Sequence, residues 1–319
     1  MNRALLALLL GAVISGLNPL LVRYAAIDPA AVGFWRVAVT LPLFLLWRAP
    51  AASGGASETV PVWRDRLLLI LAGAAYGADL VVWYWSITLT SVANAQLFAY
   101  TYPLMVAVAA ALLLGQRMGL RGWSAVALGL SGAALVVAGG GAGLAGILAG
   151  GIKLGDALGF AAAGCYTVTL LIQGSLRQRV GTRRILLDGT IGALLVLLPA
   201  ALLGPRGFLP PDAGQWGLIG LLGLLTFASQ VLVIYALAKL PVVLAAISGT
   251  LSVGVAAASG WLLLGEPLGP VQGIGVAVVL AAILMAERKP MPSKPRVVRT
   301  PRPVPRAGGE RARSLPNAA

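Results

Sequence analysis

The sequence contains no histidine and a single cysteine, Cys165. The absence of histidine excludes Ser-His-Asp and Cys-His catalysis, HExxH zinc sites and haem ligation by histidine. One cysteine cannot form an internal disulfide or a thiolate cluster, and the apolar run around it favours an ordinary small buried side chain. We therefore expect no catalytic residues, no metal site and no cofactor.

Charged residues are also scarce, at 11% of the 319 residues, where a soluble domain carries about 25%. Hydrophobic residues make up 59% of the chain, and its mean hydropathy is +0.90. A soluble chain of this length could not bury so much apolar surface and still cover itself with polar groups. The composition therefore predicts an integral membrane protein, with the lipid bilayer as its surroundings.

The basic charge that is present gathers in a tail. The net charge is +14, and nine of the Lys and Arg residues follow Ala286. This distribution argues against a nucleic-acid-binding face on a folded domain. Residues 287–319 are basic and rich in proline, so we expect a disordered cytoplasmic tail near anionic lipid headgroups.

Apolar runs long enough to cross a bilayer, which takes roughly 20 residues, predict ten transmembrane helices. The first run follows Arg3 as in a signal peptide, but it continues past any small-residue cleavage site to Tyr24, and the internal repeat described below needs it. It therefore serves as both targeting signal and first helix. Away from the helix ends, the expected helix 31–48 contains one charge, Arg36, and the expected helix 66–88 contains one, Asp79. The expected helices are 4–24, 31–48, 66–88, 92–114, 121–139, 156–175, 186–204, 214–238, 241–264 and 269–286.

The basic residues of the loops indicate the orientation. With ten helices and a cytoplasmic N-terminus, eleven basic residues before the tail fall inside and three, Arg23, Lys153 and Arg206, fall outside. Cytoplasmic loops carry the excess of Lys and Arg. Both termini are therefore expected in the cytoplasm.

The chain also repeats itself. Residues 112–119 read LLLGQRMG and residues 262–269 read LLLGEPLG, which is five matches in eight at an offset of 150. This predicts a first repeat at 1–140, a glycine-rich linker at 141–155 and a second repeat at 156–286. Each repeat has five helices, and an odd number makes the second enter the membrane from the opposite side. The expected fold is all-α, with ten transmembrane helices as two inverted five-helix repeats.

Three segments carry a resemblance to a known family: FWRVAVTLPLF at 34–44, SITLTSVANAQLFAYTYPLMVAVAAALLLGQ at 86–116, and YALAKLPVVL followed by LLLGEPLG within 235–269. They resemble the drug/metabolite transporter superfamily, of the ten-helix EamA type, over about 1–286. Glu266 matches the family pattern, but Gln116 stands at the same place in the first copy. Pro103 likewise matches, while Val253 stands opposite it. The resemblance implies movement of small organic metabolites, often outward, without ATP.

Intramembrane charges are rare and usually face a cavity or a partner. Arg36 and Asp79 lie at similar expected depth, and Asn18 lies near them in the first helix. Three interpretations stay open: an Arg36–Asp79 structural ion pair, Arg36 reaching to the headgroups, or substrate contact by at least one of the two. An isolated buried carboxylate favours its protonated form, and a nearby guanidinium favours the ionised form. Asp79 could thus carry a proton or hold a substrate ammonium.

Aromatic and amide side chains form a second candidate group. Tyr76, Asp79 and Trp83 share one helix face, and Asn94, Phe98 and Tyr102 share another. Serines stand at the matching second-copy places of Asp79, Phe98 and Tyr102. Packing between helices is the alternative role for these aromatics. The candidate substrate-binding residues are Asn18, Arg36, Tyr76, Asp79, Trp83, Asn94, Phe98, Tyr102 and Gln230.

These features together favour a secondary transporter rather than an enzyme. We expect it to export a small organic metabolite, with an amino acid as one candidate, by alternating access across a bacterial plasma membrane. The proton is a candidate coupling ion, nucleic acid is not an expected partner, and monomer and homodimer both stay open. The alternative is a non-transport membrane protein: a scaffold, a receptor or a lipid-modifying enzyme.

Overall fold

The computed structural model describes most of the chain, and all regular structure within that part is helical. Gln116, Glu266, residues 141–153 of the expected linker and the tail from Arg288 onward lie outside the described residues. The described ranges are 3–22, 24–47, 62–90, 92–113, 119–139, 154–177, 179–265 and 269–287.

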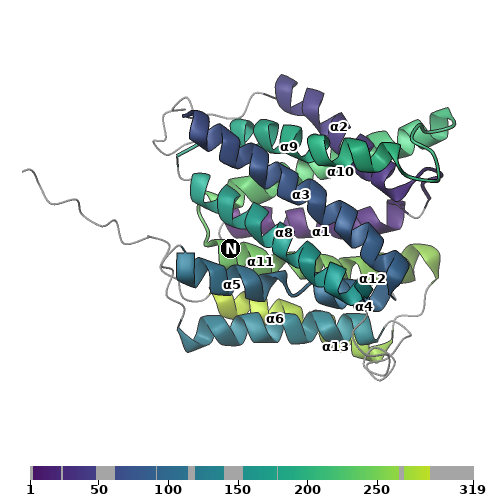
Figure 1. Ribbon diagram of the computed structural model, residues 1–319. Helices are drawn as coiled ribbons and strands as arrows, with labels where there is room; N and C mark the ends of the chain where they lie inside the picture. The colour runs from purple at the N-terminus through teal and green to yellow at the C-terminus, as the bar shows by residue number, and fades with distance from the viewer. Residues whose placement is uncertain are drawn as a thin grey trace, which may run out of the picture.

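The described helices lie roughly alongside one another in a bundle (Figure 1). Their bounds are α1 Arg3–Val22, α2 Pro29–Leu46, α3 Trp63–Leu89, α4 Val92–Ala99, α5 Tyr102–Leu113, α6 Leu120–Ala138, α8 Leu154–Leu176, α9 Thr182–Leu202, α10 Ala213–Leu237, α11 Val242–Gly249, α12 Leu251–Leu264 and α13 Pro270–Glu287.

These helices supply the ten expected crossings in the described part of the chain. Nine segments are long and apolar enough to span a membrane, and Pro270–Ala286 is a slightly shorter apolar helix. This count takes α4 with α5, and α11 with α12, as one crossing each. Many large apolar side chains, such as Leu112 and Trp85, point away from the protein interior, as lipid-facing residues do.

The fourth and ninth crossings are broken, although the sequence predicted continuous helices over 92–114 and 241–264. Pro103 explains the first break, because proline has no N–H and its ring clashes with the preceding turn of a helix; α4 accordingly ends at Ala99 and α5 begins at Tyr102. The second copy has no proline there. At Thr250 the backbone tightens instead, and its N–H donates to the carbonyl of Ile247, three residues back.

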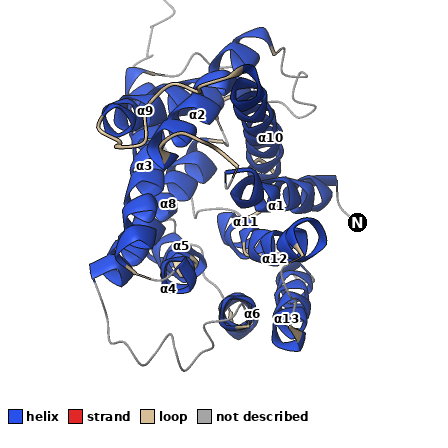
Figure 2. Cartoon of the chain, turned by 90° about the vertical axis from the view of Figure 1, so that its right-hand side faces the viewer, coloured by secondary structure: helices blue, strands red, loops and turns tan. Residues whose placement is uncertain are grey.

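The packing of the helices follows the internal repeat. α4 at Val92–Ala99 and α11 at Val242–Gly249 occupy the same positions at an offset of 150. α3 packs on α8 and α9, and their counterparts repeat this arrangement, since α10 packs on α1 and α2. α2 pairs with its counterpart α9 at one edge of the bundle and α6 with α13 at the other (Figure 2). Exchanging the two repeats therefore preserves the main helix pairs, as expected for two-fold related repeats.

Arginines gather at the end of the bundle where α1, α3, α6 and α9 begin, which we name the arginine-rich end. The Nε and Nη2 of Arg183 donate to the carbonyls of Phe44 and Leu45 at the end of α2. Arg121 donates to Met285 near the end of α13. These contacts join one repeat to the other, because each arginine lies in one repeat and its acceptor in the other.

Aromatic residues gather at the opposite end, which we name the aromatic end. Trp35 stacks between Phe208 and Trp216, with ring centroids 5.2 and 5.0 Å away. The indole N–H of Trp35 also donates to the carbonyl of Phe208, at 2.8 Å. Asp28 caps α2 here by accepting the N–H of Ala30. At this end, ring packing and the Trp35 hydrogen bond to Phe208 join the two repeats.

Candidate functional site

A central cavity of about 460 Å³ lies between the two repeats. Residues of α1 to α5 line it from one repeat, and residues of α8, α10, α11 and α12 line it from the other. It reaches Val22, Pro29 and Ile87 near the aromatic end. Pockets for small organic molecules usually measure about 300–1,000 Å³ and are mostly apolar with a few polar groups. The central cavity has this size and character.

Six of the nine candidate residues line this cavity. They come from four different crossings, α1, α2, α3 and the broken fourth, and the bundle brings them together at one place. The six are Asn18, Arg36, Tyr76, Asp79, Trp83 and Tyr102.

The two intramembrane charges face the same cavity. Arg36 is 8% exposed, so its guanidinium does not extend to the headgroups. Its Nε has no hydrogen-bond partner among the described residues, and the same holds for the Oδ1 of Asn18. Arg36 interacts electrostatically with Tyr76, Tyr84 and Asp79.

Arg36 and Asp79 do not form a contact ion pair. The ion pairs in the described part of the chain join Arg66 and Arg184 to Asp188, and Arg179 to Asp65. Asp79 keeps some accessible surface, which faces the cavity. A basic and an acidic side chain thus line one cavity without direct contact between them.

Hydroxyl groups surround the cavity on other sides. The hydroxyls of Tyr100 and Ser252 lie 2.9 Å apart, and those of Ser15 and Ser229 lie 2.6 Å apart. The Tyr102 hydroxyl donates to the carbonyl of Ala246 at 3.0 Å. Each of these bonds joins the first repeat to the second. These hydrogen bonds connect the two repeats at the wall of the cavity.

Three candidate residues are not brought to the cavity by the described structure. The side chain of Asn94 is outside the described part. Phe98 lies beside Gly159 of α8 instead of lining the cavity. The expected shared face of Asn94, Phe98 and Tyr102 assumed one continuous helix, and the break between α4 and α5 rotates Tyr102 away from it. Gln230 lines a different, smaller pocket.

Several cavity residues were missed as candidates. Tyr84 lies eight residues after Tyr76 and four after Leu80, so it shares their face of α3. The spacing of residues on α3 could therefore have identified it as a candidate. Gln96 lies in α4, and Tyr100 lies at the break, where helical periodicity does not continue. Tyr166 on α8 packs edge-to-face on Tyr102 with centroids 4.9 Å apart, and no sequence signal places these two rings together.

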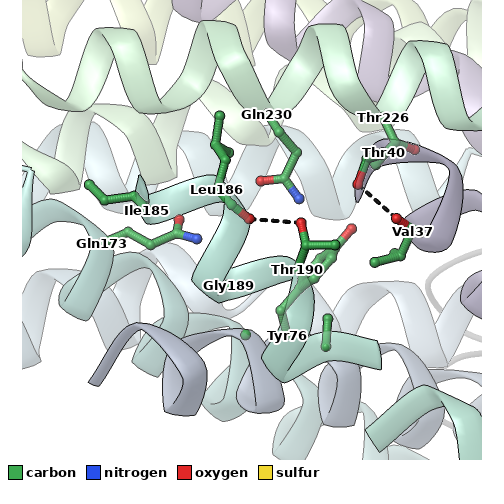
Figure 3. A pocket seen from close by; sticks show the side chains of 12 residues that line it. Val37, Thr40, Tyr76, Gln173, Ile185, Leu186, Gly189, Thr190, Thr226 and Gln230 are labelled. Atoms are coloured by element: carbon green, nitrogen blue, oxygen red, sulfur yellow. Dashed lines mark hydrogen bonds between the residues drawn. The ribbon is translucent and has the colours of Figure 1, made fainter. Parts of the chain in front are cut away.

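The smaller pocket measures about 20 Å³ and lies among α2, α3, α8, α9 and α10. It shares Tyr76 with the central cavity. Figure 3 shows the Gln173 and Gln230 amides directed into the space beside Leu186 and Thr190. We name this space the inner pocket.

The comparisons with known proteins agree with this architecture. The model of the EamA-like transporter family matches residues 2–138 and again 153–287, one match for each repeat. The chain belongs to the EamA-like transporter family. It is therefore a multi-pass membrane transporter and not an enzyme, which confirms the resemblance to the drug/metabolite transporter superfamily and excludes the lipid-modifying enzyme.

A structural relative supports the fold. A solved crystal structure, described only as that of a protein, superposes with a TM-score of 0.69 and covers 89% of this chain and 96% of its own. Its sequence identity is 18%, so the similarity concerns the fold alone. The curated proteins contain no match to this chain.

Proposed function

We propose that this EamA-family protein exports a small zwitterionic organic molecule, of which an amino acid is the simplest case, through the central cavity. One observation carries the proposal: Arg36 and Asp79, of opposite charge, face one cavity without a contact ion pair. Arg36 suits a carboxylate because the guanidinium presents planar paired donors. Asp79 suits an ammonium group.

The rest of the wall fits such a substrate. Trp83, Tyr84 and Tyr102 offer ring surfaces for an apolar side chain, and Asn18 adds an amide to the wall whose Oδ1 has no hydrogen-bond partner among the described residues. The desolvation of two charged substrate groups is costly unless each meets a counter-charge. A cavity with one cation and one anion supplies both.

The shape of the cavity supports alternating access. The cavity extends toward the aromatic end, while buried apolar side chains, among them Phe44, Leu69 and Ile185, fill the bundle toward the arginine-rich end. With the arginine-rich end in the cytoplasm, as the positive-inside rule favours, this conformation faces outward. Both termini then lie in the cytoplasm of a bacterial cell, and Asp79 is the group that would carry a coupling proton.

Neutralising the two side chains tests the proposal. A panel of amino acids and analogues, tested for export or for relief of toxicity in expressing cells, first identifies a substrate. Asp79→Asn and Arg36→Gln are then each compared with the double substitution, at matched folded abundance. We expect all three to abolish transport, because each removes a substrate contact. Asp65→Asn, which opens the exposed pair with Arg179, serves as the control and should transport normally.

A different outcome would contradict the proposal. If Arg36 and Asp79 only stabilise each other through the field they share, removing one leaves a buried charge uncompensated, which costs about 3–5 kcal/mol. The single variants would then lose abundance, and the double variant would recover both abundance and transport. Full transport by the double variant would therefore show that neither charge contacts substrate.

A further inference from the structure

The inner pocket lies on the side of the central cavity that faces the arginine-rich end. Along α2, which runs toward that end, Thr40 of the pocket lies one turn beyond Arg36 of the cavity. On α9, which starts at that end, the pocket takes the first half of the helix, from Ile185 to Ala193. The two spaces therefore follow one another along the bundle, with Tyr76 contributing to both walls.

The lining of the inner pocket is uncharged, and half of its twelve residues have polar side chains. It includes Thr40, Thr190, Thr226, Gln173, Gln230 and Tyr76. Each threonine hydroxyl donates to a backbone carbonyl of its own helix, at 2.7 to 2.8 Å. The threonine protons are thus engaged, and the hydroxyl oxygens can still accept hydrogen bonds from the pocket (Figure 3).

The two glutamines make this lining unlike ordinary helix packing. Neither the Gln173 nor the Gln230 side-chain amide has a hydrogen bond to a protein group in the part of the chain that the structure describes, and Gln173 is 8% exposed. Amides placed in a membrane interior need hydrogen-bond partners. A pocket of about 20 Å³ holds about one water molecule. The lining therefore suits a wet space between the repeats better than a packing defect.

The inner pocket is closed on its far side. Leu176, Ile185 and Leu69, each at most 1% exposed, belong to the apolar cluster between the pocket and the arginine-rich end. Beyond them, Arg183 holds the end of α2 through two carbonyls. In this conformation, the central cavity extends toward the aromatic end, and Tyr76 lies in the wall that it shares with the inner pocket.

We propose that the inner pocket is the closed, arginine-side half of the substrate pathway, and that the Tyr76 side chain is the barrier between it and the central cavity. The inference rests on the proposed alternating-access transport. When the apolar cluster separates, the glutamine amides and threonine oxygens become the polar walls along which substrate leaves the cavity. Tyr76 contacts both spaces and has to move for substrate to pass.

Cysteine accessibility tests this barrier without knowledge of the substrate. Thr190→Cys is placed in a Cys165→Ser background, and a membrane-impermeant cationic methanethiosulfonate is added from each side of oriented membrane vesicles. Tyr76→Ala is then added to remove the barrier, and Tyr76→Phe to keep its bulk. Val37→Ala is the matched control, because Val37 lines the inner pocket but not the central cavity.

We expect Thr190→Cys to react from the arginine-rich side, when the apolar cluster opens during the transport cycle, and to be nearly unreactive from the aromatic side. Tyr76→Ala should raise the rate from the aromatic side by an order of magnitude, because permeation depends on the width of the path. Tyr76→Phe and Val37→Ala should leave that rate unchanged. Labelling is measured on the monodisperse fraction of each variant, so that misfolded protein does not contribute.

Two results would overturn the inference. An unchanged rate from the aromatic side in Tyr76→Ala would show that Tyr76 is not the barrier. A Thr190→Cys that is unreactive from both sides would show that the pocket lies on no path. Neither result depends on Arg36, Asp79 or substrate identity. If the Arg36 and Asp79 double variant transports normally while the labelling results are as expected, the proposal of a zwitterionic substrate is contradicted and the proposal of a Tyr76 barrier stands.

Discussion

The contact between α3 and α9 leaves no room for a side chain at Gly73. A Cβ at this position would overlap the backbone carbonyl of Gly189, and a Cβ at Gly192 would overlap that of Ile70 in the same way. Both obstacles are backbone atoms of a helix, so no side-chain rotation can relieve them. Gly73→Ala is therefore expected to force α3 and α9 apart.

The size of the effect follows from the required movement. Cβ atoms are rarely found within 3.0 Å of another heavy atom, and relief of the Gly73 overlap needs a displacement of about 1 Å. A gap of 0.5–1 Å loses roughly a quarter to a half of the dispersion energy of the atoms that face it. Between helices in lipid, close packing is a main source of association. We expect Gly73→Ala to lower the free energy of unfolding by about 2–3 kcal/mol, which is at the upper end for overpacked sites. This loss corresponds to a roughly 30- to 150-fold smaller ratio of folded to unfolded protein.

The measurement compares Gly73→Ala with Gly164→Ala, whose added Cβ would meet no atom within 4 Å. Both proteins are extracted in mild detergent, and the monodisperse fraction is followed by size-exclusion chromatography after heating. Gly73→Ala should lose its monodisperse peak at a clearly lower temperature, while Gly164→Ala should behave as the parent does. Equal melting of the two variants would refute the reasoning, since it would mean that α3 and α9 do not meet through their backbones.

Other contacts give further predictions. Asp28→Ala should destabilise the protein by about 1 kcal/mol through loss of the α2 cap on Ala30, and Asp28→Asn should restore most of it; thermal melting in detergent measures both. Arg183→Met should raise the labelling rate of Thr190→Cys from the arginine-rich side, because the end of α2 loses two hydrogen bonds to the other repeat. An unchanged rate would show that Arg183 does not help to close that side of the inner pocket. In a protein without Cys165, an impermeant thiol reagent added outside the cell should label Gly207→Cys and should not label Gly181→Cys. The reverse pattern would show that the orientation in the membrane is the opposite of the expected one.

The number of crossings, the repeat and the two charged positions could all be found in the sequence. Crossings are detectable because lipid demands long apolar runs whatever the neighbouring helices are. Arg36 and Asp79 stand out for the same reason, since a charge inside such a run is costly and rarely without purpose. The repeat was visible because LLLGQRMG and LLLGEPLG keep the same spacing before each last helix.

The faces of the helices required the tertiary structure. Every helix here is apolar on several sides, so periodicity separates lipid-facing from protein-facing positions poorly. The break at Tyr100 and Thr101 ends the periodicity of α4, so the face expected for Asn94, Phe98 and Tyr102 does not continue across it. The cavity takes Tyr100 and Tyr102 but not Phe98. Gln230 looked like another residue of the main site but lies in the inner pocket.

Composition and local pattern thus determined that the chain crosses the membrane ten times and where it carries charge. Only the packing of the two repeats decided that Arg36 and Asp79 share a cavity without touching, and that Tyr76 stands between that cavity and a second polar space. The physical reason is that insertion into lipid depends on the hydropathy of each segment separately. The cavity, by contrast, depends on close contacts between residues far apart in the chain, such as Tyr102 with Tyr166 and Gly73 with Gly189, which no single segment encodes.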